Sequence, residues 1–131
     1  SRLHLHDRKP FEALRRCTAA ADVGLSLDRP TVENFRFSLP NKLFDYLHAG
    51  LPVVCSDLPV AGKFVKDEAI GEVASTAEGD EAIARSVADA VSRLLAAPPA
   101  QAHLAQVASQ HHWEAYETTL LKALHTLQER G

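Results

Sequence analysis

The sequence has little cysteine, no long apolar run and no strong excess of charge of either sign. Its two cysteines, Cys17 and Cys55, form no Cys-x-x-Cys pair. Because two cysteines are too few for a disulfide framework, we expect two buried thiols in a reducing compartment, and hence a cytoplasmic protein. No stretch approaches the roughly 18 consecutive apolar residues of a membrane-spanning helix, so we expect no membrane span.

The balance of charge excludes two classes of partner. A net charge of −3 spread over 131 residues gives no basic field for nucleic acid, and no stretch is rich enough in Lys and Arg for a membrane surface. With 46% hydrophobic and 24% charged residues, the composition is that of one ordinary globular domain. The start, SRLHLHDRKP, lacks an initiator Met and the apolar run of a signal peptide, so we expect a piece of a longer chain.

Several catalytic motifs are also missing from the sequence. There is no Gly-x-Gly-x-x-Gly, P-loop or Gly-x-Ser-x-Gly motif, which argues against a dinucleotide dehydrogenase, an NTPase and a serine hydrolase. The seven histidines suggest a metal site at first, since His4 and His6 share one face of an expected strand and His111 adjoins His112. Because no Cys or acid cluster accompanies them at a recognisable spacing, we expect no metal site.

Short apolar runs alternate with helical periodicity, which is typical of an α/β fold with a parallel sheet. The pattern predicts strands at residues 2–6, 22–27, 52–56 and 71–75. It predicts helices at residues 10–20, 38–49 and 83–95, a loop at 28–38, and two closing helices. We interpret residues 1–131 as a single partial Rossmann-like domain, with 99–131 as its C-terminal helices. The last of these carries an apolar stripe from Trp113 to Leu127 that requires a partner surface.

The stretch SLPNKLFDYLHAGLPVVCSD, residues 38–57, is the most informative part of the chain. At 100° per residue, one side of its helix is apolar: Leu39, Leu43, Phe44 and Leu47. The opposite side is polar: Asn41, Asp45 and His48. Gly50 suits the position after the helix because it adopts positive φ freely, and Pro52 prevents further helix.

The start of this helix predicts an anion site. Unsatisfied N–H groups and a partial positive charge at a helix N-terminus bind phosphate without a dedicated cation. Asp45 lies roughly 10 Å along the axis from Ser38, a reach comparable to that of a ribose attached to a diphosphate. We therefore expect the carboxylate of Asp45 to accept hydrogen bonds from both ribose hydroxyls, while the amides at the helix start bind the pyrophosphate.

The string SLPNKLFDYLHAGLPVVCSDLP, preceded by ADVGLSL and followed by GEV, resembles the nucleotide-sugar-binding half of retaining GT-B glycosyltransferases. The resemblance covers roughly residues 10–95 and is most specific in the central twenty. It implies a Rossmann-like C-terminal domain that binds a nucleoside-diphosphate sugar against a separate acceptor domain. It also implies transfer of the sugar with retained configuration, with no cofactor and no obligatory metal.

The resemblance assigns roles to residues of this chain. It implies that Asp45 binds the ribose and that the backbone of Ser38 and Leu39 meets the diphosphate. Many relatives carry a further acid eight positions before the ribose-binding one, but that position here is Phe37. Glu33, with eleven residues between it and Asp45, is the nearest upstream acid and the candidate for contact with the donor sugar. The catalytic residues are not identified.

Alternatives remain open for the residues and for the whole chain. Lys42 either reaches a phosphate as a point charge or is an ordinary exposed lysine. A complete domain of this kind begins with two further strand and helix units, so we expect a fragment that is not competent alone. A sheet without those units has an open edge, which predicts self-association or docking to another chain. The competing functions are a non-catalytic Rossmann-like interaction module and a sugar-nucleotide epimerase.

Overall fold

A computed structural model describes residues 2–77 and 79–129 of the chain. Three parallel strands form one sheet in the order β1-β2-β3: β1 (Gly24–Ser26), β2 (Val53–Ser56) and β3 (Gly71–Ala74). The helices of the described residues are α1 (Phe11–Ala19), α2 (Glu33–Phe37), α3 (Asn41–His48), α4 (Ala61–Asp67), α5 (Asp80–Ala96), α6 (Gln101–Gln110) and α7 (Trp113–Glu129). The predicted α/β class, with helices flanking a parallel sheet, is confirmed.

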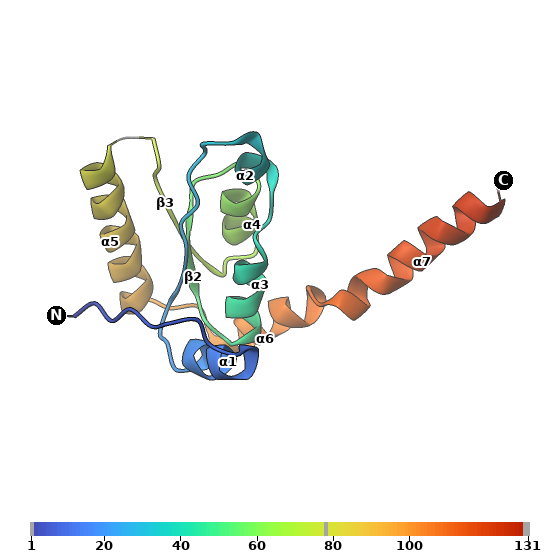
Figure 1. The fold of residues 1–131 in the computed structure, drawn as a ribbon, viewed down its shortest axis with the longest axis horizontal. Helices are drawn as coiled ribbons and strands as arrows, with labels where there is room; N and C mark the ends of the chain where they lie inside the picture. Colours follow the sequence, from blue (N-terminus) through green and yellow to red (C-terminus); the bar gives the residue numbers. More distant parts are fainter. Residues whose placement is uncertain (1, 78, 130–131) are drawn as a thin grey trace.

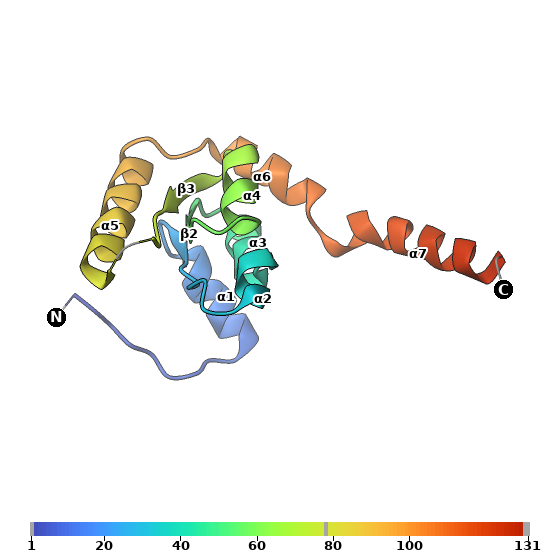
Figure 2. The same ribbon diagram turned by 90° about the horizontal axis from the view of Figure 1, so that it is seen from above.

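The central strand β2 lies between two helical layers. Its four residues are all buried, as expected for a parallel strand covered on both faces. Figures 1 and 2 show α5 on one side of the sheet and α3 and α4 on the other. Val53 and Cys55 pack toward α3, α4 and α6, whereas Val54 packs toward α5. Because successive side chains of β2 point to opposite faces of the sheet, the strand contributes to the hydrophobic core on each face.

Helix α3 is held against the sheet by its apolar side. Leu43 and Leu47 are 0% and 1% exposed, and truncation of such residues to alanine costs roughly 2–5 kcal/mol. Asp45 and His48 are exposed, so the predicted division of the helix into two sides is confirmed. The helix ends as predicted before Gly50, whose φ of 75° lies in the left-handed region.

The first turn of α3 lies later than the sequence predicts. The helix begins at Asn41 rather than at Ser38. Pro40 explains the difference, because a proline disfavours helical backbone in the residue before it and is itself tolerated at a helix start. Ser38 is extended, with φ −88° and ψ 154°, and therefore belongs to the connection between α2 and α3.

Three other predictions of secondary structure are wrong or incomplete. Residues 2–6 form no strand, since alternation specifies a strand only where one face is buried, and Leu5 is 87% exposed. The expected loop at 28–38 contains the short helix α2. The strand expected at 22–27 is reduced to β1. Helix α4 is not predicted by the sequence pattern, because its seven residues are too few to show a period.

The two cysteines lie in different surroundings. Cys55 in β2 is fully buried, as predicted. Burial, reinforced by the nearby carboxylate of Asp57, raises the pKa of the Cys55 thiol to about 11. Cys17 is exposed, so the prediction of a second buried thiol is wrong. The physical reason is that α1 buries none of its residues.

The C-terminal helices are present as predicted. Helix α6 contributes Leu104, Val107 and Ala108 to the core, whereas α7 buries no residue and extends away from the sheet in Figure 1. The apolar side chains of its stripe are exposed, among them Trp113 at 66% and Leu127 at 66%. Within residues 2–77 and 79–129, no helix combines the length and the apolar character needed to cross a membrane.

Candidate functional site

The candidate site lies where the chain leaves β1 and enters α3. The chain leaves β1 at Ser26, passes through α2 and enters α3 at Asn41. The amine Nζ of Lys42 lies 3.3 Å from Oδ1 of Asp28, two residues beyond β1. This pair places the first turn of α3 beside the carboxyl end of β1. Ligands of open α/β sheets bind at this edge.

The N-terminus of α3 is suited to an anion. Pro40 stands at its N-cap and supplies no side-chain hydrogen bond, and no acidic residue lies in the first turn. Uncapped amides at a helix start carry a partial positive charge, so they favour a phosphate. Lys42 adds a positive charge to the same turn, with its side chain 42% exposed and its amine paired with Asp28.

Asp45 lies one turn into α3, at an exposed position. Since the helix begins at Asn41, the carboxylate is about 6 Å along the axis from the first helical residue rather than roughly 10 Å. Asn41 and Asp45 are four residues apart and therefore share one side of the helix. The carboxylate of Asp45 is thus within reach of a group attached to a phosphate bound at the helix start.

The other predicted site residues are placed around this turn. Ser38 and Leu39 are half-buried and come directly before the helix, and Leu39 packs against the core. Glu33 is the first residue of α2, and it is exposed. The structure therefore gathers Lys42 and Asp45 on α3, with Ser38 and Leu39 leading into it. It separates Glu33 from them by the length of α2.

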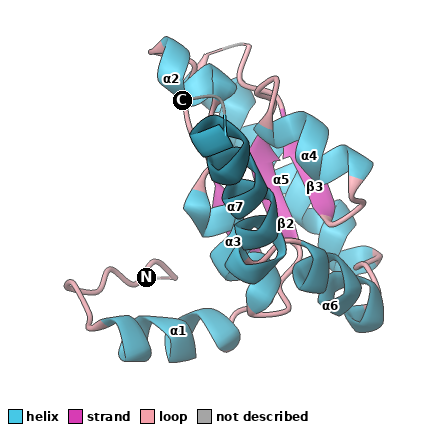
Figure 3. Cartoon of the chain, turned by 90° about the vertical axis from the view of Figure 1, so that its right-hand side faces the viewer, coloured by secondary structure: helices cyan, strands magenta, loops and turns pink. Residues whose placement is uncertain are grey.

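An open concavity of about 770 Å³ lies between α1 and α3 and includes this part of the helix. Figure 3 shows the two helices, with α1 below α3. The lining residues are Phe11, Glu12, Leu14, Arg15, Arg16, Thr18, Ala19, Lys42, Asp45, Tyr46, His48 and Ala49. Besides the histidine, three of them are cationic and two, Glu12 and Asp45, are acidic, so the lining is compatible with an anionic ligand that also presents hydroxyl groups to Asp45.

Two other concavities are less suitable for a phosphate. One of about 680 Å³ at the start of α5 is lined by three carboxylates, Asp80, Glu81 and Asp89, and by one cation, Arg85, so its net negative charge disfavours an anion. Another, of about 390 Å³, lies beyond β2. Its two lysines, Lys63 and Lys66, are matched by two aspartates, Asp57 and Asp67, so its lining carries no excess of positive charge.

Two polar residues at the end of β1 are not predicted from the sequence. Asp28 orients Lys42, and the one signal for it is a polar residue directly after a strand. Ser26 ends β1 at 2% exposure, and its Oγ is the one buried side-chain oxygen or nitrogen of the described residues without a hydrogen-bond partner. A serine within an apolar strand gives no signal in the sequence.

The histidines and cysteines are not grouped as metal ligands. Throughout the described part of the chain, no three His, Cys, Asp or Glu side chains come together in a way that could hold a metal ion. The expectation of a donor site that works without a metal stays a prediction.

Comparison with models of protein families, with curated proteins and with solved structures found no match to this chain.

Proposed function

We propose that this chain is the donor-binding part of a glycosyltransferase that moves a sugar from a nucleoside-diphosphate sugar to an acceptor with retention of configuration. The observation that carries the proposal is the first turn of α3. Its uncapped amides, the amine of Lys42 and the carboxylate of Asp45 lie within one turn of helix at the carboxyl end of a parallel strand.

Each group suits one part of the donor. The diphosphate lies at the amides before Leu43, where the backbone of Ser38 and Leu39 leads into the helix. The amine of Lys42, oriented by Asp28, approaches a phosphate oxygen as a point charge. The carboxylate of Asp45 accepts hydrogen bonds from the ribose hydroxyls. Glu33, the first residue of α2, is the candidate for contact with the transferred sugar.

The exposed edge of the sheet supports the proposal that this chain acts together with another segment or chain. Strand β1 is an edge of the sheet, and Leu25 within it and Leu27 directly after it are 43% and 41% exposed. Such an edge pairs readily with additional strands. We propose that the acceptor domain and further strands are supplied by another segment or chain, and that this chain alone self-associates. We further propose that the full enzyme acts in the cytoplasm.

Titration calorimetry with UDP, GDP, ADP and dTDP tests the proposal. Saturable heat is expected for at least one nucleotide, and the matching nucleoside without phosphates should bind at least about tenfold more weakly, since it lacks the charge-assisted bonds at the helix start. No saturable heat for any nucleotide would contradict the proposal and would favour a non-catalytic interaction module. Release of an epimerised donor by the chain joined to its partner domain would instead favour the epimerase.

A further inference from the structure

His111 forms the elbow between α6 and α7. It is the C-cap residue of α6, with φ −120° and ψ 58°, and α7 begins two residues later at Trp113. Because α7 buries none of its own residues, its direction depends on contacts close to the elbow. The side chain of His111 is 17% exposed, so its surroundings are mostly protein.

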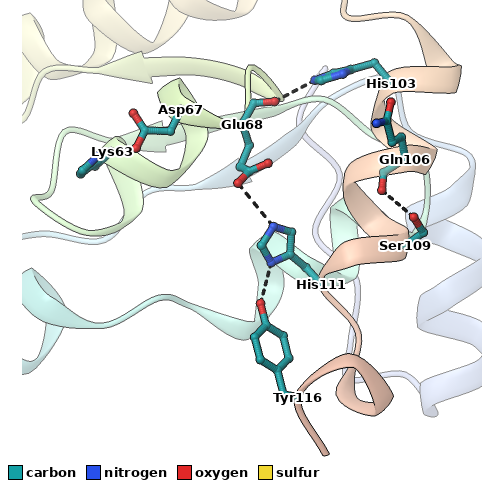
Figure 4. A network of polar contacts seen from close by, with 8 residues as sticks. All are labelled: Lys63, Asp67, Glu68, His103, Gln106, Ser109, His111 and Tyr116. Carbon is teal, nitrogen blue, oxygen red and sulfur yellow. Dashed lines mark hydrogen bonds and ion pairs between the residues drawn. The ribbon is translucent and has the colours of Figure 1, made fainter. Parts of the chain in front are cut away.

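The ring of His111 contacts three other helices. Its centroid lies 5.1 Å from that of Phe64 on α4, edge to face, and 6.2 Å from that of Phe44 on α3. Its Nε2 lies 3.5 Å from Oε1 of Glu68, the C-cap of α4. Its Nδ1 lies 2.7 Å from the hydroxyl of Tyr116 on α7. Figure 4 shows the imidazole between Glu68 and Tyr116, so one ring connects the body of the fold to α7.

Further ionisable groups surround the elbow. Nε2 of His48, the last residue of α3, lies 3.0 Å from the carbonyl oxygen of His111. Nε2 of His103 on α6 lies 2.7 Å from the carbonyl oxygen of Glu68. At the start of α7, Nδ1 of His112 lies 2.9 Å from Oε2 of Glu114. A hydrogen bond from its own backbone amide, and then one from His112, lowers the pKa of Glu114, which keeps this carboxylate charged.

The two contacts of His111 respond differently to its protonation. A neutral imidazole has one N–H and no charge, so it forms no ion pair with Glu68, while its Nδ1 accepts from the Tyr116 hydroxyl or donates to it according to the tautomer. An imidazolium donates at both nitrogens. Nε2 then forms an ion pair with the Glu68 carboxylate, and the Tyr116 oxygen accepts from Nδ1. Protonation therefore strengthens the link to α4 and keeps the link to α7.

The neighbouring histidines act in the same direction. A protonated His48 always has a proton on Nε2 to donate to the His111 carbonyl, whereas a neutral ring does so in only one tautomer. A protonated His112 forms an ion pair with Glu114. Each contact is thus stronger when its ring is charged. Histidine is the residue whose charge changes between about pH 5 and pH 8.

We propose that His111 is a pH-sensitive latch that holds α7 at a fixed angle to the body in mildly acidic solution and releases it in mildly alkaline solution. The latch determines where the apolar side chains of α7 are presented. Its effect increases as pH falls, because the charged rings favour the closed arrangement.

Pulsed electron paramagnetic resonance between two spin labels tests this proposal. The labels are attached at Ala88→Cys on α5 and Gln128→Cys on α7, in a Cys17→Ala background that leaves only buried Cys55. We expect a narrow distance distribution at about pH 6 and one roughly twofold wider at about pH 8. Equal widths at the two pH values would overturn the proposal.

Two variants separate the latch from a general effect of pH. Glu68→Gln keeps the shape of the side chain and its hydrogen-bonding capacity but removes its charge, so most of the response to pH should disappear. His125→Gln, a matched change at an exposed histidine of α7 away from the elbow, should keep the response. A full response in Glu68→Gln, or a loss of response in His125→Gln, would refute the assignment to His111. Far-ultraviolet circular dichroism verifies that each variant is folded.

Discussion

Gly24 of β1 lies directly against the ring of Tyr46 on α3. A Cβ atom at position 24 would lie 2.3 Å from Cγ of Tyr46, well inside van der Waals contact. The Tyr46 hydroxyl donates a hydrogen bond to the carbonyl oxygen of Leu25 at 3.2 Å. The close approach of strand and helix therefore depends on the missing side chain of Gly24, and it fixes the face of α3 that carries Asp45.

Gly24→Ala should therefore destabilise the fold. We expect a loss of about 1–3 kcal/mol in the free energy of unfolding, because the added methyl group must displace Tyr46 or separate α3 from β1. Denaturant unfolding followed by circular dichroism measures this loss. Gly79→Ala is the control, since a Cβ there meets no atom within 4 Å. Equal stability of the two variants would show that the contact is not tight.

Ser26→Ala tests the buried hydroxyl at the end of β1. In the absence of ligand we expect the variant to be as stable as the parent or more stable by up to about 1 kcal/mol, because an unpaired buried hydroxyl carries a desolvation cost. Thermal and denaturant unfolding measure the difference. A loss of more than about 1 kcal/mol would mean that the hydroxyl has a partner in solution.

The two cysteines should differ in reactivity. Exposed Cys17 should react with a thiol reagent at about the rate of a free thiol, while Cys55 should react only after unfolding. Cys17→Ala should remove the fast phase and leave the slow one. A fast reaction of both thiols in the native state would contradict the burial of β2.

The raised pKa of Cys55 also predicts a loss of stability in alkali. Folding raises this pKa from 9.0 to about 11, so the folded state retains a proton that the unfolded state loses. Stability should therefore be unaffected by this group below about pH 9 and should fall as pH rises from about 9 to 11. Cys55→Ala should remove this dependence, although the smaller side chain lowers stability at every pH.

Sedimentation equilibrium tests the expected self-association. The weight-average mass should rise with concentration, because the edge of β1 and the apolar stripe of α7 are both exposed. Replacing Leu120 and Leu124 with glutamine should reduce the rise by shortening the stripe, whereas replacing Thr118 and Thr119 with glutamine should not. A clean monomer at high concentration would contradict the expectation.

The parts of the fold that sequence predicts well are those with strong periodicity. Strand β2 is a continuous apolar run, and α3 and α5 show helical spacing over at least two turns, so their existence follows from local pattern. Helices α2 and α4, with five and seven residues, are too short to show such a pattern. Residues 2–6 alternate, but alternation gives a strand only beside a suitable neighbour and over a buried face.

The residues of the candidate site also differ in how well the sequence predicts them. Asp45 can be predicted because its side of α3 follows from spacing alone. Asp28 cannot, because its contact with Lys42 depends on how the end of β1 meets the first turn of α3. The start of α3 was predicted three residues early, and the effect of Pro40 on Leu39 is the signal that corrects it. Tertiary contacts, rather than propensities, determine these details.

The central claim is that Asp45 binds the ribose of a nucleoside-diphosphate donor. Its most direct test is the nucleotide affinity of Asp45→Ala beside that of Asp89→Ala, a matched change at an exposed aspartate on α5. Titration calorimetry with the tightest-binding nucleotide should show a loss of about 1.5–3 kcal/mol, or roughly 10- to 150-fold in Kd, for Asp45→Ala. Asp89→Ala should bind as the parent does. An unchanged affinity in Asp45→Ala would remove Asp45 from the site and contradict the account.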